Sequence, residues 1–338
     1  MSAPAPDELL ARAADAGIHR IALPTPFAVG RVNCWLIEDE PLTLLDTGPN
    51  SGKALDELER ALAERGHRVE DLELIVISHQ HMDHLGLASI LARRSGAEVA
   101  ALDALAPWLA DFTASMEADD AFGEAVMARH GVPDDLRLAL RAVSQAFRGW
   151  GARVDVTRPL APDDVLQLRN RTLRVHRRPG HSPSDMVLHD EARGILLAAD
   201  HLIKHISSNP LVSRPLDGGD PTQRPQALVI YLDSLRRTQQ MQDVELVLTG
   251  HGDPVADHVA LIDERFRLHA RRAAKIERLL ADHPLSANEV AHELWGNVAV
   301  TQAYLTISEV LGHVDLLLNA GSVVEVEGDD GVVRFRHA

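Results

Sequence analysis

The segment His79-Gln80-His81-Met82-Asp83-His84 concentrates groups that could bind metal ions. Side chains two positions apart in an extended chain point the same way, so His79 and His81 can face one ion. A turn into the next helix can direct Asp83 and His84 to a neighbouring position. Neutral imidazole and carboxylate suit zinc and related first-row metals. Four ligands within six residues exceed what one tetrahedral site with a free water position would use, so the motif predicts two adjacent ions.

Three further ligands are expected where predicted strands end. His181 lies in a tight Pro-Gly-His-Ser-Pro turn, Asp200 follows the predicted strand 195–198, and His251 follows the predicted strand 245–248. His251 stands between two glycines, and core packing explains a histidine in that setting poorly. A ligand carried on a backbone turn is the simpler interpretation.

These blocks occur in an order that resembles the metallo-β-lactamase superfamily over roughly residues 18–260. The resemblance implies an α+β fold, an αββα sandwich with the metal site at one edge of two packed sheets. The blocks are Asp-Thr-Gly at 46–48, His-Gln-His-Met-Asp-His at 79–84, Pro-Gly-His-Ser at 179–182, Ala-Ala-Asp at 198–200 and Thr-Gly-His-Gly at 249–252.

The resemblance also implies a role for each residue. Asp46 would lie behind a metal-bound histidine and orient it, as carboxylates commonly do. Asp200 would bridge the two ions, and Asp83 could hold the attacking hydroxide, so these two carboxylates are the expected catalytic residues. A hydroxide shared by two cations would then attack a carbonyl carbon. The implied ligands are His79, His81 and His181 for the first ion, Asp83, His84 and His251 for the second, and Asp200 for both.

A second, narrower resemblance concerns residues 200–210 and the C-terminal part of the chain. Together they resemble the glyoxalase II-like and lactamase-like-protein-2-like branch, whose members act on esters, thioesters and in some cases nucleic acids. We therefore expect substrate-pocket residues in this loop, although each could also be an ordinary loop residue. His201 could instead cap a strand or face water. They are His201, His205, Ser207 and Asn209.

The chain is predicted to form a hydrolase domain over 1–262 and a smaller C-terminal module over 263–338. The Ala- and Leu-rich stretch 102–150 is predicted to be a helical insertion, either a lid over the site or helices with their own core. The C-terminal module should contain a long helix, a helix capped by Ser286, another helix and a hairpin, a winged-helix-like arrangement. The basic run 265–275 is expected to be the solvated face of the long helix.

Charge and composition exclude several classes of protein. The 338 residues contain 34 Lys and Arg against 50 Asp and Glu, a net charge of −16, and the part from 283 onward has two basic and eight acidic residues. Nucleic acid is therefore an unexpected partner, and a small molecule the expected one. The single cysteine, Cys34, rules out a disulfide framework and is expected to be buried. No export signal or membrane span is recognisable, so we expect a cytoplasmic chain that could form a homodimer.

The leading hypothesis is a di-metal hydrolase that cleaves a small acyl substrate: a thioester, a lactone or an ester. We expect two Zn²⁺ per chain, with Fe or Mn as alternatives. A nuclease or phosphodiesterase on the same ions is one alternative function, and a mononuclear iron dioxygenase of the persulfide type is another. A metal-stabilised interaction module is a third, disfavoured because the whole ligand set is present.

Overall fold

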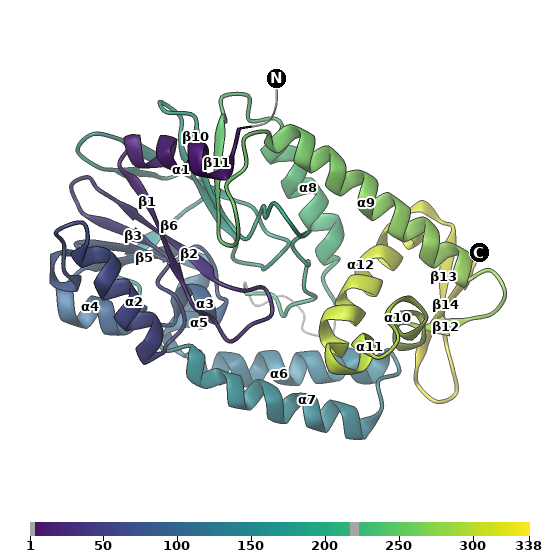
Figure 1. The fold of residues 1–338 in the computed structure, drawn as a ribbon. Coiled ribbons are helices and arrows are strands. Elements are labelled where there is room, and N and C mark those ends of the chain that lie inside the picture. Colours follow the sequence, from purple (N-terminus) through teal and green to yellow (C-terminus); the bar gives the residue numbers. More distant parts are fainter. Residues whose placement is uncertain (1–3, 217–222) are drawn as a thin grey trace.

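The computed structural model describes residues 4–216 and 223–338. Its centre is a pair of sheets packed face to face (Figure 1). The first sheet has the order β1-β2-β3-β4-β5-β6 and the second the order β11-β10-β9-β8-β7. The strands are β1 (Ile18–Leu23), β2 (Val32–Ile37), β3 (Thr43–Leu45), β4 (Leu74–Val76), β5 (Glu98–Leu102), β6 (Arg158–Leu160), β7 (Val165–Gln167), β8 (Thr172–Arg177), β9 (Met186–Asp190), β10 (Ile195–Ala199) and β11 (Leu246–Thr249).

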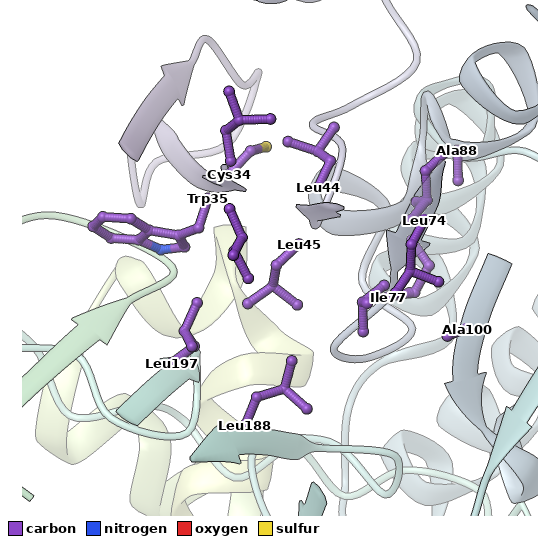
Figure 2. Close-up of a cluster of buried hydrophobic side chains, with 14 of the residues drawn as sticks. Cys34, Trp35, Leu44, Leu45, Leu74, Ile77, Ala88, Ala100, Leu188 and Leu197 are labelled. Atoms are coloured by element: carbon purple, nitrogen blue, oxygen red, sulfur yellow. The ribbon is translucent and has the colours of Figure 1, made fainter. Parts of the chain in front are cut away.

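The main core lies between the sheets. Leu45 of β3 faces Leu188 of β9 and Leu197 of β10 (Figure 2). Alternate residues of β10 point outward instead, because successive side chains of a strand lie on opposite faces, and there Leu196 packs under helix α8 (Ala227–Gln239). Cys34 is fully buried in the main core, and burial raises the pKa of its thiol well above the usual value. It therefore behaves as a small apolar residue, as predicted.

Helices cover the outer faces of both sheets, which confirms the predicted α+β fold with an αββα arrangement (Figure 1). None of the helices among the described residues is long and apolar enough to cross a membrane. The helices of this part are α1 (Pro6–Asp15), α2 (Gly52–Ala63), α3 (Met82–Leu85), α4 (Ala88–Ser95) and α8 (Ala227–Gln239), with 3₁₀ turns at Val69–Asp71, Asp103–Leu105 and Arg148–Trp150.

The stretch 102–150 is helical, as expected, and contains α5 (Ala106–Ala110), α6 (Phe112–Arg129) and α7 (Asp134–Phe147). Helices α6 and α7 extend from the sheets toward the C-terminal part (Figure 1). Phe122 and Met127 of α6 share a core with Leu311 of the C-terminal part. The insertion therefore joins the two parts of the molecule.

The C-terminal part contains the elements that the sequence predicts, together with a short additional strand and helix. Ser286 caps α10 by accepting a hydrogen bond from the backbone N–H of Glu289, whose carboxylate accepts one from the N–H of Ser286. The predicted boundary at residue 262 falls inside α9. The elements are α9 (His258–Leu279), β12 (Leu285–Ser286), α10 (Ala287–Trp295), α11 (Val298–Thr301), α12 (Ala303–Ala320), β13 (Val323–Glu327) and β14 (Val333–His337), and the three strands pair in the order β12-β14-β13.

Candidate metal centre

The predicted ligands come from turns, and in the case of Asp83 and His84 from the short helix α3, that follow strands of both sheets. The His-rich motif follows β4, His181 lies between β8 and β9, and Asp200 and His251 follow β10 and β11. Strand β2 holds the last of these turns, because the backbone N–H of Asn33 donates to the carbonyl of Gly250 at 2.6 Å and Trp35 Nε1 donates to the carbonyl of Thr249 at 3.2 Å. The two sheets thus fix the ligand turns relative to each other.

A first group of ligand atoms comprises His79, His81, His181 and Asp200, all within 4.8 Å of one another. His81 Nδ1 lies 3.0 Å from His79 Nε2 and 3.0 Å from His181 Nε2. Two nitrogens bound to one tetrahedral zinc ion, each about 2.0 Å from it, would be separated by about 3.3 Å. The spacing of the three imidazoles therefore fits a shared cation.

A second group comprises Asp83, His84 and His251, also within 4.8 Å of one another. The Asp200 carboxylate reaches both groups, since Oδ2 lies 3.6 Å from His181 Nε2 and 3.4 Å from His251 Nε2. Its Oδ1 lies 3.5 Å from His84 Nε2. The structure thus brings all seven predicted ligands together in two groups joined by Asp200, the arrangement expected for a bridging carboxylate.

Hydrogen bonds to Nδ1 fix three of the histidines so that Nε2 faces the centre. His84 donates to Asp46 Oδ2 at 2.7 Å, His181 to the carbonyl of Asn209 at 3.1 Å, and His251 to the carbonyl of Arg31 at 2.8 Å. A carbonyl or carboxylate can only accept, so in the neutral ring Nδ1 carries the proton and Nε2 keeps its lone pair for a metal ion. Such outer partners are the usual support of metal-binding histidines.

Asp46 also organises the start of the motif, in agreement with the orienting role expected for it. Its carboxylate accepts from the backbone N–H of Ser78 at 2.9 Å and from Ser78 Oγ at 2.8 Å. Ser78 Oγ in turn accepts from His79 Nδ1 at 2.9 Å, which leaves His79 Nε2 free as well. Sequence reasoning alone misses this role of Ser78, and the one signal for it is that Ser78 directly precedes the metal-binding motif.

Burial and charge divide the histidines of the centre into two kinds. Burial lowers the pKa of His79 well below its usual value and that of His81 to about 3. Burial also acts to lower the pKa of His84 and His251, but Asp200 and other carboxylates outweigh it, so the pKa of His84 rises well above its usual value and that of His251 rises to about 9.

The carboxylates show the converse effect. Burial acts to raise the pKa of Asp200, but His84 and His251 hold it well below its usual value. Two buried polar atoms, His84 Nε2 and Asp200 Oδ1, have no hydrogen-bond partner. Buried polar groups normally have partners, and a cation between these atoms would supply one. The donor set therefore fits two metal ions.

A cavity of about 620 Å³ opens onto the centre. It is bounded by metal-site residues on one side and mostly by apolar side chains on the other. Ser207 and Asn209 line it. The ligand side includes His81, Asp83, His181, Asp200 and His251, and the apolar side includes Phe27, Met82, Leu140, Val143, Phe147, Ile203, Ile206, Leu211, Tyr304 and Leu305.

The structure does not place His201 and His205 in this cavity. His201 is buried behind the site, where its Nε2 bonds Thr238 Oγ1 at 2.8 Å and its ring lies against Tyr231. His205 lines a separate depression beside Arg31 and Gly252. The chain turns sharply after β10, so a side chain one residue beyond the ligand Asp200 points away from the cavity.

The basic run 265–275 is expected to face solvent, and this is wrong for two of its polar residues. Arg265 and His269 are 4% and 1% exposed, respectively, and both face the loop that follows Asp200. They lie four positions apart and so share one face of α9. That spacing was the signal available in the sequence, but charge alone made the run resemble a solvated face.

Comparison with known proteins gives concordant results. The model of the metallo-beta-lactamase superfamily matches residues 28–251. The chain is 33% identical over 300 residues to the probable metallo-hydrolase YqjP of Bacillus subtilis (strain 168), covering 88% of this chain and 91% of that protein.

Two crystal structures are similar over nearly the whole chain. A beta-lactamase domain protein from Burkholderia ambifaria has a TM-score of 0.80 and 28% identity, covering 95% of this chain and 92% of that one. A metallo-beta-lactamase family protein from Thermus thermophilus has a TM-score of 0.78 and 25% identity, covering 95% and 99%. The likeness therefore includes the insertion and the C-terminal part.

Proposed function

Since the chain belongs to the metallo-β-lactamase superfamily and is a metal-dependent hydrolase, we propose that it uses two zinc ions to cleave a small acyl substrate. The expected substrate is an ester, a thioester or a lactone. The observation that carries the proposal is the Asp200 carboxylate, which lies within 3.6 Å of histidine nitrogens from both ligand groups. When bound, two such ions would supply a water of lowered pKa and positive charge opposite a developing oxyanion.

The chain's own residues would prepare the site for that chemistry. Asp46 and the carbonyls of Asn209 and Arg31 hold three imidazoles with Nε2 free, so little reorganisation is needed at the moment of reaction. Asp83 lies at the cavity wall with Oδ2 3.4 Å from His251 Nε2. Its carboxylate can accept a hydrogen bond from the attacking water and fix the direction of attack.

The charged residues of the cavity support an acyl substrate over a polyanionic one. The acidic residues of α6 that line the cavity are paired with arginines: Asp119 with Arg214 at 2.7 Å and Glu124 with Arg141 at 2.9 Å. Asp120 is paired with Arg148. Because these charges compensate one another, the cavity offers a phosphate backbone little attraction, in keeping with the net charge of −16.

A panel of substrates would test the proposal. We expect the zinc-reconstituted protein to hydrolyse 4-nitrophenyl esters, aryl thioesters or lactones faster than bis(4-nitrophenyl) phosphate. Asp200→Ala should abolish turnover while circular dichroism stays unchanged. Asp253→Ala is the matched control, since this half-exposed carboxylate near β11 lies outside both ligand groups. Turnover of the phosphodiester alone, or full activity of Asp200→Ala, would refute the proposal.

A further inference from the structure

The loop 203–209 follows Asp200 in the sequence, and the C-terminal part of the molecule holds it in position. The buried guanidinium of Arg265 on α9 donates through Nη2 to the carbonyls of Ile203 at 3.1 Å, Lys204 at 2.8 Å and Ile206 at 3.2 Å. At the end of the same loop, Asn209 Nδ2 donates to the carbonyl of Leu305 on α12 at 3.1 Å. The position of the loop in the cavity wall therefore depends on α9 and α12.

One helical turn beyond Arg265, a chain of hydrogen bonds leads from the cavity into the C-terminal core. Ser207 Oγ lies 3.1 Å from His269 Nε2, His269 Nδ1 lies 3.1 Å from His313 Nε2, and His313 Nδ1 lies 2.6 Å from the carbonyl of Glu309. Both histidines are buried, at 1% and 0% exposed. Burial lowers the pKa of His269 to about 3 and also lowers that of His313, so both rings are neutral.

The last acceptor fixes the direction of every bond in this chain. A carbonyl only accepts, so His313 carries its proton on Nδ1 and its Nε2 must accept. His269 then donates from Nδ1, which leaves its Nε2 as an acceptor. Ser207 must therefore donate its single hydroxyl proton to His269, and the Ser207 oxygen can offer only lone pairs to other groups.

The same residues do not favour a metal ion. Glu309, the remaining group near the two histidines that could bind one, has its carboxylate bound by Arg272. With that carboxylate held by Arg272, His269 Nδ1 and His313 Nε2 lack a third ligand among the described residues, and a hydrogen bond of 3.1 Å between them satisfies both nitrogens. The histidine pair is better explained as a support for Ser207.

We propose that Ser207 is a substrate-positioning residue that accepts a hydrogen bond, and that the preferred acyl substrate carries an O–H or N–H donor. Ser207 lines the cavity that opens onto the metal centre, which places its oxygen within reach of a bound substrate. Asn209, on the same loop, donates through Nδ2 to the carbonyl of Leu305 and so helps to hold Ser207 in place. The inference rests on the proposed acyl hydrolase function.

Matched substrates would test it. Thioesters of 2- and 3-hydroxyoctanoic acid offer a donor, whereas their methoxy counterparts offer only an acceptor. We expect kcat/KM to favour one hydroxy compound over its methoxy counterpart by about three- to tenfold, the range for one neutral hydrogen bond. Ser207→Ala should bring this ratio close to one. An unchanged ratio in Ser207→Ala, or no preference in the wild type, would overturn the inference while leaving the hydrolase proposal in place.

A second variant tests the direction of the hydrogen bonds that run from Ser207 to the Glu309 carbonyl. In His313→Leu, His269 loses its acceptor and can move its proton to Nε2, so Ser207 becomes free to donate and the hydroxy preference should collapse. His130→Leu is the matched control, because His130 is also buried but takes no part in this series of hydrogen bonds. The control should keep the hydroxy preference. A preference that survives in His313→Leu would contradict the proposed direction.

Two measurements need no turnover and so separate this inference from the function it rests on. Nitrogen NMR of the imidazoles should show His269 and His313 protonated at Nδ1. The hydroxy and methoxy acids, as reaction products, should bind with dissociation constants that differ in the same direction as kcat/KM. A His269 ring protonated at Nε2, or equal dissociation constants, would refute the role of Ser207 even if no thioester is hydrolysed.

Discussion

Replacing Asp46 by asparagine should weaken the binding of one metal ion and affect the other less. The Asp46 carboxylate accepts three hydrogen bonds: Oδ1 from the backbone N–H of Ser78, and Oδ2 from Ser78 Oγ and His84 Nδ1. An amide has only one acceptor oxygen. If the amide oxygen of Asn at position 46 keeps the hydrogen bond from the Ser78 N–H, its amide nitrogen takes the place of Oδ2. That nitrogen is itself a donor and would face Ser78 Oγ and His84 Nδ1. His84 then loses the bond that holds Nε2 toward the centre.

The magnitude follows from the loss of that support. Removing an outer partner of a metal-bound histidine typically weakens binding by 10- to 100-fold, about 1.4 to 2.7 kcal/mol. The loss should fall on the ion held by Asp83, His84 and His251. The first ion should change less, since Ser78 Oγ can still accept from His79 Nδ1.

The assay is a zinc titration of metal-free protein against a competing chromophoric chelator, which resolves two dissociation constants. Asp39→Asn is a suitable control, because the Asp39 carboxylate is inaccessible to solvent but binds Arg171 at 3.0 Å and no predicted ligand. We expect this control to keep both zinc affinities, even if it lowers the free energy of unfolding. Two unchanged constants in Asp46→Asn, or an equal loss at both sites, would refute the reasoning.

Three further outcomes are expected. In Gly250→Ala the new Cβ would lie 2.1 Å from Asp200 Oδ1, so kcat/KM should fall at least 100-fold, whereas Gly149→Ala, which has open space, should match the wild type in the same ester assay. Burial, with Arg224 and Arg129, lowers the pKa of His130 to about 3, so the unfolded chain binds a proton below about pH 6.5 that the folded chain excludes. Urea unfolding should therefore show the wild type losing about 2 kcal/mol more than His130→Leu between pH 7.5 and 5, and equal losses would contradict this assignment. Chelation of the metals should lower the thermal midpoint, because an ion at 100 times its Kd stabilises the folded state by about 2.7 kcal/mol, and an unchanged midpoint would argue against metal binding by the folded chain.

Much of the site could be predicted because its candidate ligands lie on turns, or on the short helix α3, soon after strands. In such a segment the residue types and their spacing mark candidate ligands, so the seven metal-binding candidates and Asp46 can be recognised without a structure. The strands themselves were marked by short apolar runs, and the fold followed from the order of the motifs. Ligand spacing and apolar runs each involve residues close together in the sequence, so both can be recognised without knowing the tertiary contacts.

The errors arose where tertiary contacts decide the direction of a side chain. His201 and His205 follow Asp200 closely, yet the loop turns both away from the cavity. Arg265 and His269 lie in a basic run, and only the position of the loop 203–209 shows that this side of α9 is buried. Sequence spacing gives the face of a helix but not the element it will pack against.

The most direct test of a two-metal centre is anomalous diffraction from crystals of the zinc-reconstituted protein, recorded on both sides of the zinc absorption edge. We expect two peaks per chain, one among His79, His81 and His181 and one among Asp83, His84 and His251, with Asp200 in contact with both. A single peak, or a peak between His269 and His313, would contradict it.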